Sequence, residues 1–345
     1  MLFKTFGSKP SGESLNKIVA SVNYRDGSFQ NQVATRMLSE DGSYLKMLWQ
    51  FFNKPKNTAP SFPLPSIKAD IQSVANDKPV IIWFGHSSYF IRLNGQNILV
   101  DPVFSGYASP FSFTTRSFKG ADIYSTDDFP DVDLLILTHD HYDHLDYNTL
   151  LKLKSKVRSI STSLGVGSHL RFWGFDESLI TEFDWWDSKQ VTDKIQLTAA
   201  PARHFSGRTL TRGKTFWSSF ILRSGEYNIY IGSDSGYGKH FKEIGEKYGP
   251  FDIAMLEAGQ YNTNWPDIHM MPEDTVQAAV DLKAKVLMPV HWGKFSLAFH
   301  PWDEPIKRVM AKAAELHVKV TTPLIGEPVI LDSSYPDRHW WLDIK

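Results

Sequence analysis

The sequence predicts a layered α/β (α+β) fold, in which helices cover the outside of two packed β-sheets. From Pro79 onward, strand-like apolar runs come first alone and then in alternation with helical segments, an order that occurs twice. This order suits two packed sheets better than one fully parallel, doubly wound sheet. The sequence has no repeat of short fixed period, which argues against solenoids and propellers.

The composition narrows the functional class. Of the 345 residues, 42% are hydrophobic, which is enough for one large domain or two modest ones. The 37 basic residues nearly balance the 38 acidic ones, so there is no electrostatic case for nucleic-acid binding. The chain contains no cysteine, so a metal site must use His, Asp and Glu. Without a secretory signal or an apolar run near the ~20 residues that span a bilayer, we expect a cytoplasmic protein.

The chain divides near residue 78. Residues 1–78 carry turn residues and the prolines Pro60, Pro63 and Pro65, and they lack strand alternation, so we interpret them as an N-terminal extension packed on the core. Within the extension, residues 44–52 (YLKMLWQFF) are dense in large apolar side chains, which as a helix would cover most of its circumference. We expect this segment to pack on the main body. A membrane-touching or substrate-entry surface is the alternative.

Residues 79–345 are expected to form the main domain. Asn94-Gly95 separates two of its strands and is a strong hairpin signal. Ser224-Gly225 is expected to turn a second hairpin, and Pro272 to open a helix with acidic residues in its first turn. The predicted strands are 78–84, 88–94, 96–101, 131–138, 152–162, 194–200, 215–223, 227–231, 251–256, 285–289 and 319–331. The predicted helices are 164–173, 239–247, one starting at 272, and 303–316.

The chemistry is concentrated directly after the buried strand 131–138. There the chain reads HDHYDH from His139 to His144, with three histidines and two aspartates in six residues. Neutral imidazole and carboxylate are the ligands that zinc and similar ions bind when no thiolate is present. On extended backbone the rings of His139 and His141 point to the same face, and Asp143 and His144 can then serve a second ion. A His-rich surface loop is the alternative, but this cluster does not stand alone.

Three further candidates follow separate strand-like runs: His204, Asp234 and His291. Taken singly, a strand-end Asp usually caps a turn, and a lone His is usually a hydrogen-bonded structural residue. Together with the first cluster they supply the ligands of a two-ion site, with one carboxylate left over to bridge.

These motifs resemble a known family. HDHYDH is similar to the HxHxDH signature of the metallo-β-lactamase superfamily. The phrases WFGHSSYFI, LVDPVFS, GSDSGYG, FKEIGEKYGPFDIA and VHWGKFSLAFH resemble, more narrowly, the N-acylphosphatidylethanolamine-hydrolysing phospholipase D family. The similarity runs from about residue 23 to about residue 315, and it implies an αββα sandwich. The segment 261–266 (YNTNWP) departs from the animal enzymes.

The resemblance implies a role for each site residue. One zinc would be held by His139, His141 and His204, a second by Asp143, His144 and His291, and Asp234 would bridge the two. Iron or manganese also occupy such sites. His269 would stand beside the ions and contact or polarise the substrate phosphate. His86 is expected to be structural or to support the ligands rather than to act in catalysis.

For other residues the sequence leaves alternatives open. Asp101, in LVDP, is a candidate to accept the second N–H of a ligating histidine, and a turn cap is an equal alternative. Trp185 and Trp186 could line an acyl groove, although buried core is the commoner fate. Five histidines are expected to be structural or at the surface, with His300 the nearest to the pocket: His169, His240, His300, His317 and His339.

The expected function is hydrolysis of a phosphodiester, as in a phospholipase D, by a metal-bound hydroxide that Asp143 helps to orient. Two zinc ions, two aspartates and the hydroxide would leave about one positive charge, which suits a phosphodiester monoanion. A lactonase or other carboxyl-ester hydrolase is the alternative, and a non-catalytic metal-binding protein is less favoured because all seven ligands are present. The expected partner is a small molecule or a phospholipid, and peripheral membrane contact and a homodimer stay open.

Overall fold

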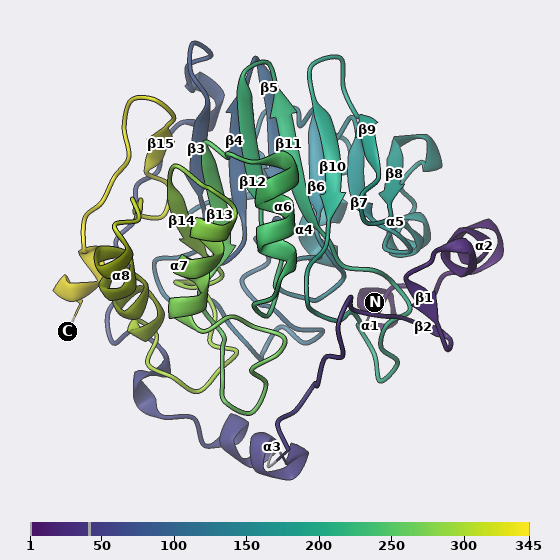
Figure 1. The fold of residues 1–345 in the computed structure, drawn as a ribbon, viewed down its shortest axis with the longest axis horizontal. Coiled ribbons are helices and arrows are strands. Elements are labelled where there is room, and N and C mark those ends of the chain that lie inside the picture. Colours follow the sequence, from purple (N-terminus) through teal and green to yellow (C-terminus); the bar gives the residue numbers. More distant parts are fainter. Residues whose placement is uncertain (1, 41–42, 345) are drawn as a thin grey trace.

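The computed structural model describes residues 2–40 and 43–344 and places two β-sheets face to face with helices outside them (Figure 1). Within these residues the first sheet has seven strands in the order β15-β3-β4-β5-β6-β7-β8, and the second has six in the order β14-β13-β12-β11-β10-β9. In the first sheet β3 to β5 are antiparallel and β5 to β8 parallel, and in the second β9 to β12 are antiparallel and β12 to β14 parallel. The predicted layered sandwich is confirmed.

The strands of the first sheet are β3 (Val80–Trp83), β4 (Tyr89–Leu93), β5 (Gln96–Val100), β6 (Leu134–Leu137), β7 (Ile160–Ser163), β8 (Ile180–Phe183) and β15 (Pro328–Ile330). Those of the second are β9 (Ser188–Gln190), β10 (Gln196–Ala200), β11 (Ser219–Ser224), β12 (Tyr227–Ile231), β13 (Ile253–Glu257) and β14 (Leu287–Val290). The helices of the main domain are α4 (Tyr147–Leu153), α5 (Gly167–Phe172), α6 (His240–Tyr248), α7 (Pro272–Asp281) and α8 (Glu304–Leu316).

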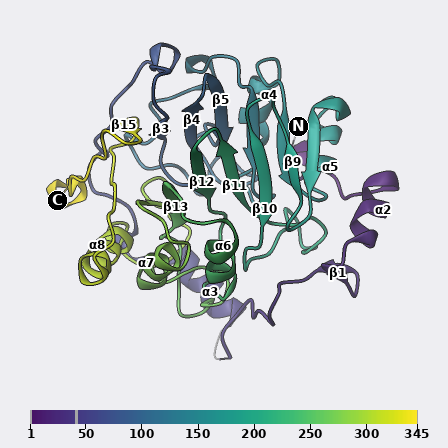
Figure 2. The ribbon, with the colours of Figure 1, turned by 45° about the horizontal axis from the view of Figure 1, so that its top comes forward.

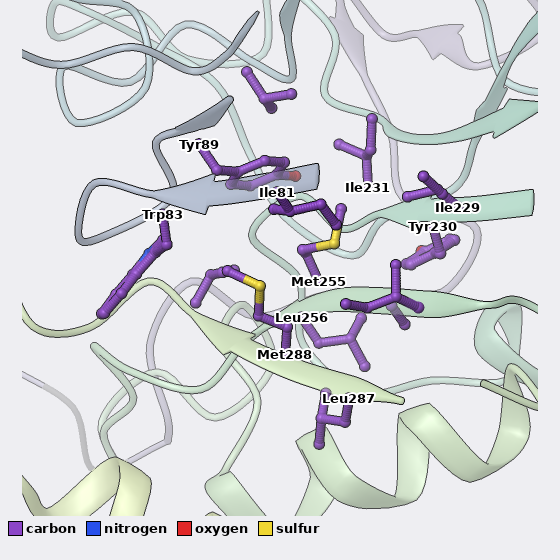
Figure 3. Close-up of a cluster of buried hydrophobic side chains, with 14 of the residues drawn as sticks. Ile81, Trp83, Tyr89, Ile229, Tyr230, Ile231, Met255, Leu256, Leu287 and Met288 are labelled. Carbon is purple, nitrogen blue, oxygen red and sulfur yellow. The ribbon is translucent and has the colours of Figure 1, made fainter. Parts of the chain in front are cut away.

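Alternation along the strands sorts the core into layers. In β3, Ile81 and Trp83 belong to the cluster between the sheets, whereas Val80 and Ile82 belong to the cluster under α4 and α5. Figure 3 shows side chains of β3 and β4 packed together with those of β12, β13 and β14, so the inner faces of both sheets share one core. Helices α6, α7 and α8 cover the outer face of the second sheet (Figures 1 and 2).

Local signals explain most element boundaries. Asn94 and Gly95 both have positive φ, 51° and 80°, as a two-residue hairpin turn between β4 and β5 requires. The prediction of one strand over 152–162 is wrong at its start, because α4 extends to Leu153 and only β7 follows. Asp146 begins that helix by accepting a hydrogen bond from the backbone N–H of Asn148. Of the strand predicted over 319–331, only the part at β15 (Pro328–Ile330) forms a named strand.

The N-terminal extension contains α1 (Leu2–Thr5), α2 (Gly12–Ala20), the short hairpin β1 (Tyr24–Arg25) and β2 (Ser28–Phe29), and α3 (Tyr44–Phe52). The predicted helix at 44–52 forms, but its expected packing holds for Met47 and not for four other large side chains. Their exposed fractions are 80% for Leu45, 55% for Leu48, 66% for Trp49 and 77% for Phe52. In Figure 1, α3 lies beyond the ends of the sheets, at the edge toward which β10 and β12 run. No helix in the described part of the chain has the length and apolarity to cross a bilayer.

Candidate metal centre

The predicted ligands follow the ends of four strands that run to one edge of the sandwich, β6, β10, β12 and β14. The loop after β6 carries His139, His141, Asp143 and His144, and a turn closed by hydrogen bonds from the N–H groups of His144 and Leu145 to the carbonyl of His141 folds it back. The other three, His204, Asp234 and His291, follow β10, β12 and β14. All seven are brought together, and all except His141 are buried.

The donor atoms gather in overlapping groups. Ligand atoms of His139, His141, His204 and Asp234 all lie within 4.8 Å of one another, and so do those of His86, Asp143, His144 and His291. A third such group comprises Asp234, Glu257, His269 and His291. These buried His and Asp clusters are consistent with a dinuclear metal site.

Asp234 lies between the first two groups. Its Oδ2 is 3.8 Å from His139 Nε2 and 3.7 Å from His204 Nε2 on one side. On the other side it is 3.2 Å from Nε2 of both His144 and His291. One carboxylate oxygen therefore contacts donors of both groups, as a bridging ligand would.

The donors fit divalent ions in chemistry and in spacing. In a tetrahedral site with metal–nitrogen bonds near 2.0 Å, donors stand about 3.3 Å apart, close to the 3.0 Å between His139 Nε2 and His141 Nδ1 and the 3.2 Å between His204 Nε2 and His141 Nδ1. In addition, His144 Nε2 and Asp234 Oδ1 are buried without a hydrogen-bond partner among the described residues. Buried polar atoms without partners are costly unless something else binds them, and ions held by these seven residues would satisfy them.

Burial and the neighbouring carboxylates set the pKa values of the histidines in the site. The pKa of His139 and His204 is held well below its usual value, mainly because burial disfavours the charged ring. Burial also opposes charge on His291, but Asp234 and then Asp143 and Glu257 outweigh it and raise its pKa to about 10. His144 likewise has a strongly raised pKa. Protons on His144 and His291 therefore balance the aspartates, and ions that bind there must displace them.

Two buried carboxylates orient the ligands from behind. Asp101 Oδ2 accepts a hydrogen bond from His144 Nδ1 at 2.8 Å, and its other oxygen accepts the backbone N–H of Thr138 at 2.9 Å. The structure thus places Asp101 in the ligand-supporting contact rather than in a plain turn cap. Glu257 was missed by sequence reasoning. Its Oε2 lies 3.2 Å from His291 Nδ1 and 2.7 Å from His269 Nδ1.

His86 and His269 stand beside the ligands. His86 Nε2 lies 2.8 Å from Asp143 Oδ2, and its backbone exchanges hydrogen bonds with the 291–292 segment. Both His86 and His291 have positive φ, 53° and 66°, a strained conformation that this backbone pairing holds in place. The His269 ring is centred 5.0 Å from that of His204 and 5.3 Å from that of His291.

A cavity of about 220 Å³ opens over the centre. Its floor consists of site residues, its walls are mainly apolar, and Arg212 is the one arginine or lysine among its described lining residues. The floor comprises His141, Asp143, Asp234, His269 and His291, and the other lining residues are Met37, Leu38, Met47, Phe205, Arg212, Gln260, Trp265, Ile268 and Leu297. Three of these, Met37, Leu38 and Met47, come from the N-terminal extension.

The remaining candidates lie away from this cavity. Trp185 packs in a core cluster with Phe216, and Trp186 stacks on Tyr248. His300, expected nearest to the pocket, stacks on Tyr261 and is absent from the lining. His169 and His240 are buried, His317 follows α8, and His339 stacks on Trp341.

Comparisons with known proteins agree with this geometry. The beta-lactamase superfamily domain model matches residues 96–292, more than half of the chain. An uncharacterized protein of Mycobacterium tuberculosis is 40% identical over 328 residues, which cover 93% of this chain and 87% of that protein. The N-acyl-phosphatidylethanolamine-hydrolyzing phospholipase D 1 of Caenorhabditis elegans is 29% identical over 62% of this chain and 64% of its own length.

Among solved structures, the metallo hydrolase Igni18 of the archaeon Ignicoccus hospitalis superposes with a TM-score of 0.57 at 20% sequence identity, over 74% of this chain and all of that one. This likeness concerns the fold. Since the family model also spans the buried His and Asp clusters from the β6 loop to His291, this chain belongs to the metallo-β-lactamase superfamily of metal-dependent hydrolases.

Proposed function

We propose that the protein hydrolyses a phosphodiester at a dinuclear metal centre, in the manner of a phospholipase D acting on an N-acylphosphatidylethanolamine-like amphiphile. The observation that carries the proposal is the cavity, whose polar floor suits a phosphate and whose apolar walls suit a chain. The relative from C. elegans that bears a phospholipase name supports the same reaction class.

The ligand set proposed for the two ions, most simply zinc, is His139, His141, His204, Asp143, His144, His291 and the shared Asp234. Such ions would polarise the substrate oxygen and make water nucleophilic at neutral pH. Asp143, held by His86, would orient the attacking water from the floor of the cavity. Because Nδ1 of His269 contacts Glu257, Nε2 is the nitrogen left to contact the substrate.

The charge balance differs from the expectation of about one residual positive charge. Asp101 and Glu257 stand directly behind ligands, so four buried carboxylates rather than two surround the centre. Their charge offsets that of two divalent ions. Attraction for an anionic substrate must then come from other groups, and Arg212 is the cation that the cavity offers.

We also propose peripheral membrane contact through α3. Leu45, Leu48, Trp49 and Phe52 are exposed on the helix whose Met47 lines the cavity. An apolar patch beside a site entrance fits the uptake of an amphiphile from a lipid surface. A lactonase is the second candidate, since about 220 Å³ lies below the ~300 Å³ of common ligand sites and suits a compact substrate.

The test is turnover of bis(p-nitrophenyl) phosphate and of N-acylphosphatidylethanolamine, with metal content measured on the same preparation. We expect two ions per chain and turnover of both diesters. Asp234→Asn should lose at least one ion and about 100-fold or more in activity. Asp193→Asn, at an exposed turn, is the control that should change neither. Bound metal with turnover of lactones and of neither diester would overturn the proposal.

A further inference from the structure

A second cavity adjoins the metal cavity, and the proposed reaction gives it no role. It has a volume of about 400 Å³ and lies where residues 25–37 of the N-terminal extension meet the 204–213 loop. The two cavities share three lining residues, Met37, Phe205 and Arg212. Arg212 can therefore contact a ligand that occupies either cavity.

The second cavity is positively charged. Arg25 and Arg212 line it, and no carboxylate occurs among its described lining residues. Neither arginine forms an ion pair within the part of the chain that the structure describes, whereas Arg171 and Arg308 are each paired with two carboxylates. Unpaired arginines in a carboxylate-free cavity favour an anionic ligand.

Arg212 is also tied to the metal centre through one aromatic ring. Its guanidinium lies 5.0 Å from the centre of the Phe205 ring. The same ring is centred 4.5 Å from the ring of His141 and 4.7 Å from that of His204. A guanidinium that lies over the face of a ring keeps the N–H groups at its edge available for an anion. Arg212 is exposed beside the centre, so its N–H groups are accessible to an anion.

The rest of the cavity is rich in hydrogen-bonding groups, since Gln30, Gln32 and Thr35 also line it. Asn31 fixes its floor: its Nδ2 donates to the carbonyl of His204 at 2.8 Å, and its Oδ1 accepts the N–H of His204 at 3.0 Å. The cavity is therefore built on a proposed ligand and suits a polar group better than an acyl chain.

We propose that this cavity binds a second anionic group of the substrate, a carboxylate or a phosphate, with Arg212 as the main contact and Arg25 as the second cation. This inference rests on the proposed hydrolase function and adds a preference, among the phosphodiesters it accepts, for those that carry a further anion near the scissile phosphate. A lipid headgroup and a water-soluble diester share this chemistry.

The experiment compares ligands that differ in one charge. Isothermal titration of the metal-loaded protein with 4-carboxyphenylphosphonate and 4-nitrophenylphosphonate contrasts a carboxylate with a neutral group of the same shape. We expect the carboxylate ligand to bind about tenfold tighter to the wild type, the scale of one charge-assisted hydrogen-bond contact. Arg212→Gln should abolish that preference, and Arg25→Gln should reduce it.

Arg223→Gln is the matched control, because Arg223 is exposed, lies 5.6 Å from the centre of the Tyr248 ring and lines neither cavity. It should keep the preference. Equal affinity of the wild type for both ligands, or loss of the preference in Arg223→Gln as well, would overturn the inference. Since binding is measured without turnover, failure of the phosphodiesterase assay would not be confused with failure of this inference.

A second pair of substrates locates the source of the anion. Turnover of N-acylphosphatidylserine is compared with that of N-acylphosphatidylethanolamine, which lacks the carboxylate. An Arg212-dependent preference for the serine lipid assigns the cavity to a headgroup. A preference confined to the phosphonates assigns it to a soluble diester.

Discussion

Glu257 is the last residue of β13, four buried apolar residues precede it, and its carboxylate faces the metal centre. One oxygen accepts the backbone N–H of Ser235 at 2.8 Å, while the other lies against His269 and His291. A carboxylate on the far nitrogen of a ligating imidazole fixes its tautomer and its orientation. Glu257 is thus placed to position a ligand and a substrate-contacting residue at once.

We therefore expect Glu257→Gln to weaken metal affinity and kcat/KM by about 10- to 100-fold each, because an amide cannot accept from both imidazoles and the N–H of Ser235 with the same strength. Metal content by mass spectrometry and titration with a competing chelator measure the first effect, and steady-state kinetics the second.

Glu182→Gln is the matched control for a buried carboxylate. Glu182 also accepts two backbone N–H groups, those of Gly165 and Gly167, and it contacts no imidazole of the centre. This variant should lose stability and keep its metal affinity. Unchanged metal affinity in Glu257→Gln would show that the contact does not position His291.

The sequence could reveal those site residues that lie next to one another along the chain, but not the isolated ones. The cluster from His139 to His144 is recognisable in the sequence because five side chains of types that can bind metals fall within six residues, four of which are proposed ligands. Glu257 carries no such signal, since one acid at the end of an apolar run resembles any strand end. The available clue was its position in a third strand that runs to the same edge as those before Asp234 and His291. Arg212 was equally hidden, because its freedom from ion pairs is a property of three-dimensional structure.

At the scale of elements, α3 and α4 show what the spacing of apolar residues can predict about a helix and what it cannot. Helix α4 was missed, and its last two residues, Lys152 and Leu153, were assigned to the strand predicted over 152–162. The helix begins instead at the capping contact of Asp146. For α3, the apolar pattern predicted a helix correctly but not its surroundings. Whether such a helix is buried depends on tertiary contacts, and of the α3 side chains that the structure describes, Met47 is the one that joins the cluster around Trp265.

The exposed face of α3 leads to a prediction about lipid surfaces. The double variant Trp49→Ser, Phe52→Ser should reduce binding to phospholipid vesicles about tenfold or more, because it removes two large apolar side chains that are 66% and 77% exposed. Turnover of bis(p-nitrophenyl) phosphate, which needs no membrane, should stay unchanged.

Vesicle co-sedimentation measures the binding. Phe113→Ser provides the control, since Phe113 is 71% exposed on a loop that lines neither cavity described above. If the α3 variant bound vesicles as well as the wild type, or lost soluble turnover to the same extent as lipid turnover, the membrane role of α3 would be wrong.

For the whole molecule, the order of strands and helices was enough to predict two sheets with helices outside. The pattern of apolar and polar residues along each element indicates which of its faces are buried. Strand order within the sheets was beyond prediction. β15 pairs with β3 across some 250 residues of sequence, and nothing local to Pro328–Ile330 specifies that partner. The meeting of three N-terminal residues with the metal cavity was hidden for the same reason.

In the same architecture, metal ions held by the proposed ligands would link the two halves of the sandwich. Four proposed ligands follow β6 of the first sheet, and the other three follow β10, β12 and β14 of the second. Ions that bind the assembled set more tightly than the unfolded chain would stabilise the folded protein by mass action. Each ion at a free concentration 100 times its dissociation constant adds about 2.7 kcal/mol, which for 345 residues raises Tm by about 4 °C.

Removal of the ions with a chelator should therefore lower Tm by about 8 °C for two ions under those conditions, and scanning calorimetry measures the change. The gain should shrink as pH falls, because protons compete with the ions for His144 and for His291, whose pKa without ions is about 10. Asp234→Asn should show a smaller metal-dependent shift, since it weakens the contact shared by both ions, while Asp193→Asn should match the wild type. Equal Tm with and without metal at neutral pH would mean that the ions do not hold the two sheets together.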